Sequence, residues 1–554
     1  MTRSVHIVER MRWMSALAVA AVAAVALAIA LGATGGQIRL VPNSSASPAA
    51  AGSSAPLDPR IATLAAHRPS ATVQAIVQFN ATVTTAKANS DAARVRGRIV
   101  GNLPIIHGLA LSLTAAEART LATNPDVHAV SLNSTVNTES LPFHMIGGQS
   151  VPTNQLQTTY DQTLGVLPLW KFGVTGTGVG VAVVDTGVDG ALPDFASKDH
   201  GASRVVASAV ANADATTATD SYGHGTDVAG IIAGNGDNRG TGDPEYGHYI
   251  GVAPNANLIS IKVSDETGEA SVLDVIYGLQ FAVEHQSQFN IRVINLSLSS
   301  TTPQSYKTDP LDAAVEAAWM HGIVVVVAAG NQGTASNAVQ YSPGNDPYVI
   351  TVGGVDENGS ANPMGDTIAS WSSRGTTQDG LQKPDVYAPG AHIVSVLAPN
   401  SVFSTSCPTC VVGNGQYIQT SGTSMAAPAI AGLVADLLQI HPNWTPDQVK
   451  GDLTSPAVTE NSSFQEPNAV KAALLWNPPL ADQGLTPSTL IDSATGAINY
   501  SLSRWSLSSW NRAKGPLRAG YALSSWNCDN CTASGGDGSA ATTLGSWNTV
   551  EPLG

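Results

Sequence analysis

Three segments of the sequence contain residue types that together could catalyse acyl transfer, the reaction by which a peptide bond is hydrolysed. Asp185 ends the apolar run VGVAVVD, His224 lies in GHGT ahead of an apolar helical pattern, and Ser424 lies in GTSMAAP at the start of another. A serine hydroxyl becomes a nucleophile when a neighbouring histidine takes its proton, and a carboxylate can orient that histidine. The three segments therefore predict a nucleophile, a general base and an orienting acid.

A fourth segment offers hydrogen-bond donors for the oxyanion that such chemistry creates. Asn331 ends the run AAGN, and its side-chain amide could donate one bond. Ser424 stands at a predicted helix start, where backbone amides are unpaired, so its own N–H could donate a second. Each residue alone has an ordinary explanation as a turn former, a structural histidine or a helix cap. Only the combination of all four segments predicts a catalytic site.

The elements that must position these residues form a regular alternation. Continuous apolar, β-branched runs predict buried strands of a parallel sheet with helices on both faces, an α/β fold. The strand runs are 179–185, 257–263, 292–298, 323–330 and 348–354, and the helical runs are 271–285, 310–321 and 424–439. In such folds functional groups gather at the carboxyl ends of the strands. The start of a helix beside His224 would favour its neutral, basic form.

The motifs VAVVDTGV, GHGTDVAG, AAGN and SGTSMAAP, in this order, resemble the subtilisin-like serine peptidases, or subtilases, over residues 155–470. The resemblance implies an endopeptidase in which His224 takes the proton of Ser424 and Asp185 holds the imidazole tautomer. Ser424 would form an acyl-enzyme with protein or peptide substrates, and Asn331 would stabilise the oxyanion. This chemistry requires no cofactor.

The same resemblance implies how a substrate would lie. It would pair as an added strand with Ser297, Leu298 and Ser299. The other wall of the primary pocket would consist of Ala328, Ala329 and Gly330. Members of the family often have glycine where Ser299 stands, and Tyr341 falls near the pocket floor. Substrate preference therefore stays open.

Two acidic residues bear on the comparison with the family. Asp227 stands where the family commonly has histidine, one helical turn after His224. Asp194, nine residues past Asp185, aligns with a calcium-ligating aspartate of many relatives, and the acidic loop 237–245 could add oxygen ligands. The resemblance thus implies a structural calcium, with solvated surface carboxylates as the alternative.

The N-terminus predicts export. Three arginines precede an uncharged, apolar stretch that completes residues 1–33, as in a signal peptide. The stretch is also long enough to cross a bilayer, so an uncleaved anchor is the alternative, and a buried core helix is a third. A Ser/Pro/Ala linker follows at 34–59. The protein is expected to be secreted or on the cell surface, with membrane contact only if the segment stays uncleaved.

Residues 60–140 predict a small α+β module. Strands are expected at 73–80, 108–113 and 127–132, and Thr114 with Glu117 has the spacing of a capping box for a helix. In position, length and element order the module resembles the inhibitory propeptide of subtilases. This implies a self-inhibited precursor, with the propeptide as intramolecular inhibitor and cleavage between residues 133 and 153. An ordinary accessory domain is the alternative.

The cysteines and the C-terminus suggest features of an extracellular chain. Cys407 with Cys410, and Cys528 with Cys531, form two closely spaced pairs that favour local disulfides over free thiols. A shared zinc site is disfavoured because the pairs lie far apart in sequence. Residues 477–554 contain a degenerate Trp/Ser/Gly repeat, which is either a small β structure for surface attachment or a poorly ordered tail.

Charge excludes one class of function. Residues 1–140 carry 11 Lys/Arg and 6 Asp/Glu, whereas the remainder carries 15 and 35, for a total of −15. The acidic remainder argues against binding nucleic acid, whose phosphates need cations. Two rival hypotheses remain. One is a catalytically silent surface protein that keeps the fold as a binding scaffold, and the other is a dedicated processing protease.

Overall fold

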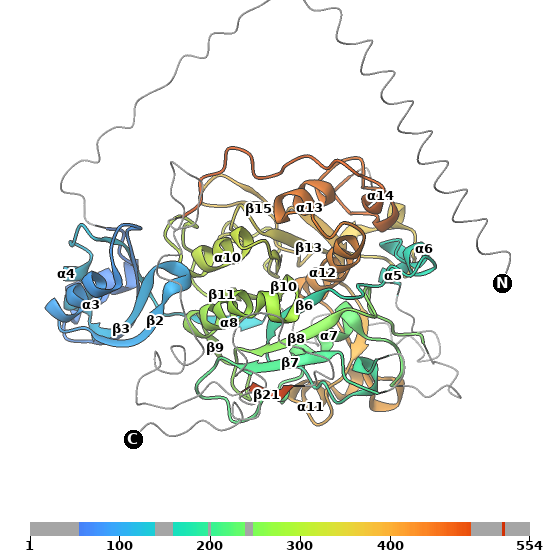
Figure 1. Ribbon diagram of the computed structural model, residues 1–554, viewed down its shortest axis with the longest axis horizontal. Coiled ribbons are helices and arrows are strands. Elements are labelled where there is room, and N and C mark those ends of the chain that lie inside the picture. The colour runs from blue at the N-terminus through green and yellow to red at the C-terminus, as the bar shows by residue number, and fades with distance from the viewer. Residues whose placement is uncertain are drawn as a thin grey trace, which may run out of the picture. The chain divides into compact units, whose positions relative to one another are not determined.

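The computed structural model describes residues 55–138, 159–197, 201–238, 247–461 and 463–488, and the backbone of 523–526. The export segment, most of the Trp-containing tail and the pair Cys528/Cys531 lie outside the described residues. Residues 55–138 are called the N-terminal unit below, and residues 159–488 together with the strand at 523–526 are called the main domain (Figure 1).

The N-terminal unit is an antiparallel sheet covered by helices. Its strand order is β2-β3-β1-β4, with β1 (Thr72–Phe79), β2 (Arg98–Leu103), β3 (Gly108–Thr114) and β4 (Val127–Leu132). The helices are α2 (Pro59–His67), α3 (Thr85–Arg94) and α4 (Ala115–Leu121). The predicted capping box of Thr114 and Glu117 begins α4. Three of these elements were not predicted: α2; α3, which buries only alanines and one aspartate; and β2, which is interrupted by a register shift.

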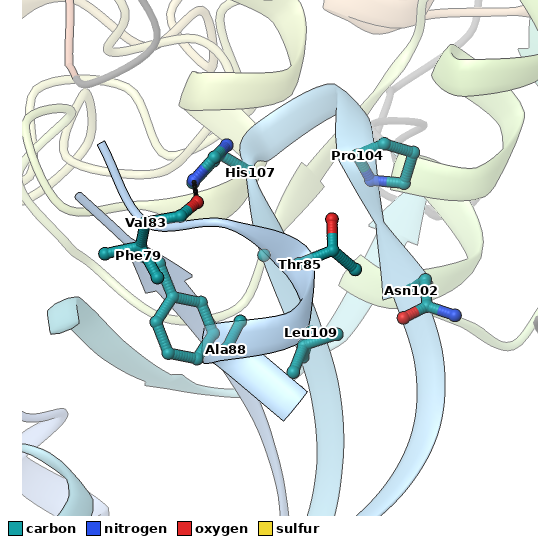
Figure 2. A pocket seen from close by; sticks show the side chains of 9 residues that line it. Phe79, Val83, Thr85, Ala88, Asn102, Pro104, His107 and Leu109 are labelled. Atoms are coloured by element: carbon teal, nitrogen blue, oxygen red, sulfur yellow. Dashed lines mark hydrogen bonds between the residues drawn. The ribbon is translucent and has the colours of Figure 1, made fainter. Parts of the chain in front are cut away.

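A small pocket lies within the N-terminal unit (Figure 2). It contains none of the residues predicted to be catalytic, and its lining is Phe79, Val83, Thr85, Ala88, Asn102, Pro104, His107, Gly108 and Leu109. The Nε2 atom of His107 is 2.7 Å from the Val83 carbonyl oxygen. Burial lowers the pKa of this histidine, so the hydrogen bond is made by a neutral ring at neutral pH.

The main domain is built on the predicted parallel sheet. Its order is β14-β13-β12-β10-β6-β8-β7-β21, and β17 also pairs with β13. The parallel strands are β6 (Gly180–Asp185), β7 (Val205–Val210), β8 (Asn257–Lys262), β10 (Ile291–Leu296), β12 (Val324–Ala328), β13 (Ile350–Asp356) and β17 (Val386–Pro389). The antiparallel edges are β14 (Thr367–Ile368) and β21 (Leu523–Trp526).

Every residue of the central strand β6 is buried, because helices cover both faces of this sheet. Helices α7 and α12 pack together, as do α8 and α10. Their bounds are α7 (His224–Ala233), α8 (Val272–Glu284), α10 (Pro310–Met320) and α12 (Thr423–Ile440). Helix α12 is apolar and long enough to cross a membrane, but 89% of it is buried, as in the core of a globular domain. The α/β class is confirmed.

Two small sheets complete the site. One has the order β11-β5-β9, with β5 (Thr135–Thr138), β9 (Ala270–Ser271) and β11 (Leu298–Ser300). The other has the order β18-β20-β19, with β18 (Ile393–Val396), β19 (Val411–Val412) and β20 (Tyr417–Thr420). The short helix α11 (Val402–Ser406) lies between β18 and β19 in sequence, and a disulfide joins Cys407 to Cys410 just after it.

Candidate active site

Asp185 and His224 meet at the carboxyl end of β6. Asp185 is the last residue of that strand, and His224 is the first residue of α7, after Gly223 with a φ of +106°. The Oδ1 atom of Asp185 lies 2.6 Å from His224 Nδ1 and also accepts a 2.7 Å bond from the Thr186 backbone N–H. A carboxylate oxygen there requires a proton on Nδ1. The other ring nitrogen, Nε2, is thereby left as the acceptor.

A second carboxylate joins the two motifs. Asp220 accepts hydrogen bonds from Thr186 Oγ1 at 2.8 Å, and from the backbone N–H groups of Gly223 and Thr226 at 2.7 Å each. Thr186 Oγ1 in turn accepts from the Gly225 N–H at 2.9 Å. Asp220 therefore fixes the turn after β6 against the start of α7. Sequence reasoning missed it, although an acidic residue just before a predicted helix is a recognisable capping signal.

The electrostatic balance at His224 differs from the expectation. Burial disfavours the imidazolium, but the charge and hydrogen bond of Asp185, with the charges of Asp227 and Asp220, raise the pKa of His224 above its usual value. The helix start was expected to favour the neutral ring, and the nearby carboxylates outweigh it. Because a general base must be neutral, a raised pKa moves the onset of activity to higher pH.

Ser424 lies in the first turn of α12. The helix is preceded by Gly422, whose φ of +151° favours glycine. The hydroxyl of Ser424 donates to the backbone carbonyl of Ser297 at 3.1 Å, and His224 Nε2 has no hydrogen-bond partner among the described residues. The bond between serine and histidine is thus not formed in this structure. Catalytic hydrogen bonds often close only when substrate is bound.

Asn331 is held beside the nucleophile. Its Oδ1 atom accepts from the backbone N–H of Thr423 at 3.0 Å and from the Thr423 hydroxyl at 3.2 Å. The same hydroxyl accepts a 3.1 Å bond from the Gly330 N–H. With its oxygen engaged by the residue before Ser424, the amide of Asn331 turns its N–H end away from Thr423.

The predicted substrate strand is already paired. Ser297 leads into β11, which is antiparallel to β5 of the N-terminal unit. The register aligns Leu298 with Thr138, Ser299 with Asn137, and Ser300 with Val136. The predicted opposite wall continues from the end of β12, and its members are the buried Ala328, Ala329 and Gly330. The chain's own strand therefore occupies the edge at which a substrate was expected to add.

Asp227 is buried near the base. Its Oδ2 atom accepts a 2.8 Å bond from the Thr420 hydroxyl. Burial raises the pKa of Asp227 to about 7, while Thr420 and His224 act in the opposite direction. This carboxyl therefore titrates close to neutral pH within one helical turn of His224.

Asp194 is the residue expected to bind calcium. It is fully buried, and burial raises its pKa to about 6, whereas the Tyr417 hydroxyl and the amides of Gly236 and Asp237 lower it. Arg204 donates to the backbone carbonyl of Asp194 at 2.8 Å. A buried carboxylate suits calcium. However, no group of three or more His, Cys, Asp or Glu side chains able to hold a metal occurs among the described residues, so calcium stays a prediction.

Known proteins resemble the chain across this site. The model of the subtilase family matches residues 176–475. Serine protease AprX of Bacillus subtilis is 40% identical over 300 residues, which cover 53% of this chain and 64% of AprX. A subtilisin of Bacillus pumilus is 36% identical over 294 residues, which cover 53% of this chain and 88% of that protein.

A solved structure is also similar. The crystal structure of fervidolysin from Fervidobacterium pennivorans, a keratinolytic enzyme related to subtilisin, matches with a TM-score of 0.56 and 25% identity. The match covers 77% of this chain and 64% of fervidolysin. The chain thus spans somewhat less than two thirds of both AprX and fervidolysin.

Proposed function

Because the chain belongs to the subtilase family, the subtilisin-like serine peptidases, we propose that it is a serine endopeptidase with Asp185, His224 and Ser424 as its triad. The observation that carries the proposal is the 2.6 Å contact of Asp185 with His224 Nδ1. It leaves Nε2 as the proton acceptor for a serine. Ser424 supplies that serine from the first turn of α12, and Asn331 is anchored to the residue before it.

The proposed reaction has two halves. In the first, His224 Nε2 removes the Ser424 proton while Oγ attacks the scissile carbonyl carbon, and Asn331 and the Ser424 N–H donate to the resulting oxyanion. The intermediate collapses as the imidazolium gives its proton to the leaving amine, which forms the acyl-enzyme. In the second half, water replaces serine as nucleophile and the same steps release the carboxylic acid. Asp185 keeps its hydrogen bond to Nδ1 throughout.

Covalent labelling tests this proposal. A fluorophosphonate probe reacts much faster with an activated serine than with other side chains, so the mature protein is expected to incorporate one probe per molecule, located on Ser424 by mass spectrometry. Ser424→Ala is the control and should take up none. A folded, processed wild-type protein that stays unlabelled would instead support the silent binding scaffold. Peptide-library profiling of the labelled enzyme would then separate a broad endopeptidase from a dedicated processing protease.

We further propose that the N-terminal unit is an inhibitory propeptide. Its strand β5 lies on β11, where a substrate strand was predicted, and Val136 is buried there. The side chain of Thr138, at the end of β5, is hydrogen-bonded to Tyr222, two residues before His224. The unit also binds the start of α8, because the Asn133 side chain accepts from the Leu273 N–H at 2.9 Å. Because the unit covers the edge at which a substrate was predicted to bind, an inhibitory propeptide is favoured over an ordinary accessory domain.

The register predicts which bond is cut during maturation. Strand β5 ends at Thr138, and Glu139 follows it in the sequence, outside the described residues. Thr138 lies opposite Leu298, the residue after Ser297, and the Ser297 carbonyl accepts the Ser424 hydroxyl. Because β5 ends beside the nucleophile, we expect maturation to cut just after it, at the bond from Glu139 to Ser140.

This prediction narrows the cleavage interval of 133–153 to a single bond, and N-terminal sequencing of the mature protein checks it. The expected N-terminus is Ser140, and Ser424→Ala should accumulate as uncut precursor. A mature chain that begins upstream of β5 would contradict the register argument. A chain that is active without any cleavage would contradict the propeptide itself.

The N-terminal segment supports export as the setting of this activity. A basic start followed by an apolar stretch within residues 1–33 directs secretion or anchoring, and a disulfide such as that of Cys407 and Cys410 persists in oxidising compartments. We therefore place the proposed endopeptidase outside the cell or on its surface, acting on proteins or peptides.

A further inference from the structure

Helix α11 is a short element with one buried apolar side chain. Ser401 begins it by accepting a 3.3 Å bond from the Ser404 N–H. Within the helix Phe403 is 3% exposed, while the other side chains are exposed or half-buried. A helix of five residues has little stability of its own. The position of α11 is therefore decided by what Phe403 contacts and by the links at its ends.

Phe403 packs against the proposed general base. The rings of Phe403 and His224 are 5.8 Å apart, edge to face at 79°, and the Tyr222 ring lies 5.3 Å from Phe403. The Phe403 N–H also donates to the Tyr222 carbonyl at 2.9 Å. At Gly223, between the two partners, an added Cβ would lie 2.9 Å from the Phe403 Cβ. The phenyl ring thus fits closely against the backbone that carries His224.

The disulfide fastens the other end of this helix. The Cys407 N–H donates to the Phe403 carbonyl at 3.3 Å, and the Cys410 N–H donates to the Cys407 carbonyl at 2.9 Å. Cys407 and Cys410 are joined, and Cys410 packs on an apolar cluster of Leu397, Phe403 and Ile418. The segment then enters β19, which pairs with β20, the strand that leads to α12. Phe403 is therefore tied both to the base and to the strand before the nucleophile.

We propose that Phe403 is a positioning residue for His224 and that the disulfide between Cys407 and Cys410 keeps it in place. This inference rests on the proposed function. The Asp185 contact fixes only the Nδ1 corner of the imidazole, so the ring can still swing about that hydrogen bond. The phenyl ring limits this swing and excludes water from the imidazole. It thereby holds Nε2 where it can receive the Ser424 proton.

The direct test is Phe403→Ala, with Phe403→Leu as a variant that keeps apolar bulk but lacks the aromatic ring. A misplaced base is expected to lower kcat about 10- to 100-fold with little change in KM. Since burial lowers the pKa of His224, letting water reach the ring should move the acidic limb of the kcat/KM profile to higher pH. Phe403→Tyr should recover most of the activity.

Active-site titration with the fluorophosphonate probe corrects each rate for the fraction of folded enzyme. Folding damage alone would lower the titrated fraction and leave kcat per active site and the pH limb unchanged, which would overturn the proposal. If wild-type enzyme turned over no peptide and took no label, the proposed function itself would fail. The two failures are therefore distinguishable.

The second cysteine pair provides a matched control for the disulfide. The double variant Cys407→Ser with Cys410→Ser is expected to lower kcat and shift the pH limb in the same direction as Phe403→Ala. The corresponding change at Cys528 and Cys531, in the tail, should leave both at wild-type values. Equal behaviour of the two double variants would overturn the role given to the disulfide.

Discussion

Asp185→Asn is expected to lower kcat about 10⁴-fold at neutral pH, the loss that this change causes in a serine peptidase triad. The physical reason is the 2.6 Å contact with His224 Nδ1. A carboxylate accepts from Nδ1–H, whereas an amide can donate to Nδ1 and stabilise the tautomer protonated on Nε2. That tautomer cannot take the Ser424 proton. KM should change little, because Asp185 does not lie on the predicted substrate strand.

Asp227→Asn is the matched control for this variant. Both carboxylates raise the pKa of His224, but only Asp185 bonds to the ring. Either change should therefore move the acidic limb of the kcat/KM profile to lower pH. Only Asp185→Asn should also lower the plateau rate by orders of magnitude. Stopped assays of peptide hydrolysis across the pH range would measure both quantities, and equal plateau losses would contradict the tautomer argument.

The sequence predicted which residues carry out the chemistry better than it predicted the contacts that hold those residues in place. Runs of β-branched residues predict the buried strands. Each chemical motif follows such a strand or begins a helix, so Asp185, His224 and Ser424 could be assigned to one edge of the sheet. The strand β7 (VVASAV) was missed because alanine and serine interrupt its run of β-branched residues. Strand β5 was missed because it is four residues long and pairs with β11 and β9, which are distant in sequence.

The parts of the site that were not predicted depend on contacts distant in sequence. Asp220 is a capping residue in a local view, and its role appears only when β6 and α7 come together. Phe403 lies 179 positions after His224, within a segment whose turn and cysteine residues predict little beyond a loop. The pKa of His224 likewise reflects a balance of burial against carboxylates that no single motif contains.

Asn331 is the residue whose replacement is expected to have the next largest effect. In a subtilisin, removing one oxyanion donor lowers kcat about 10²- to 10³-fold, and the same loss is expected here for Asn331→Leu. The complication is that Asn331 Oδ1 also accepts two bonds from Thr423, at 3.0 and 3.2 Å. Losing these bonds could loosen the start of α12, so a fall in rate would have two explanations.

Asn331→Asp separates the two explanations. The carboxylate keeps an acceptor for Thr423 but has no N–H to offer, and its charge opposes the oxyanion. If the amide acts as an oxyanion donor, Asp should lower kcat at least as much as Leu, with KM nearly constant for both. If its main role is to anchor Thr423, Asp should retain most of the activity. Steady-state kinetics on one peptide substrate, normalised by active-site titration, distinguishes the two outcomes.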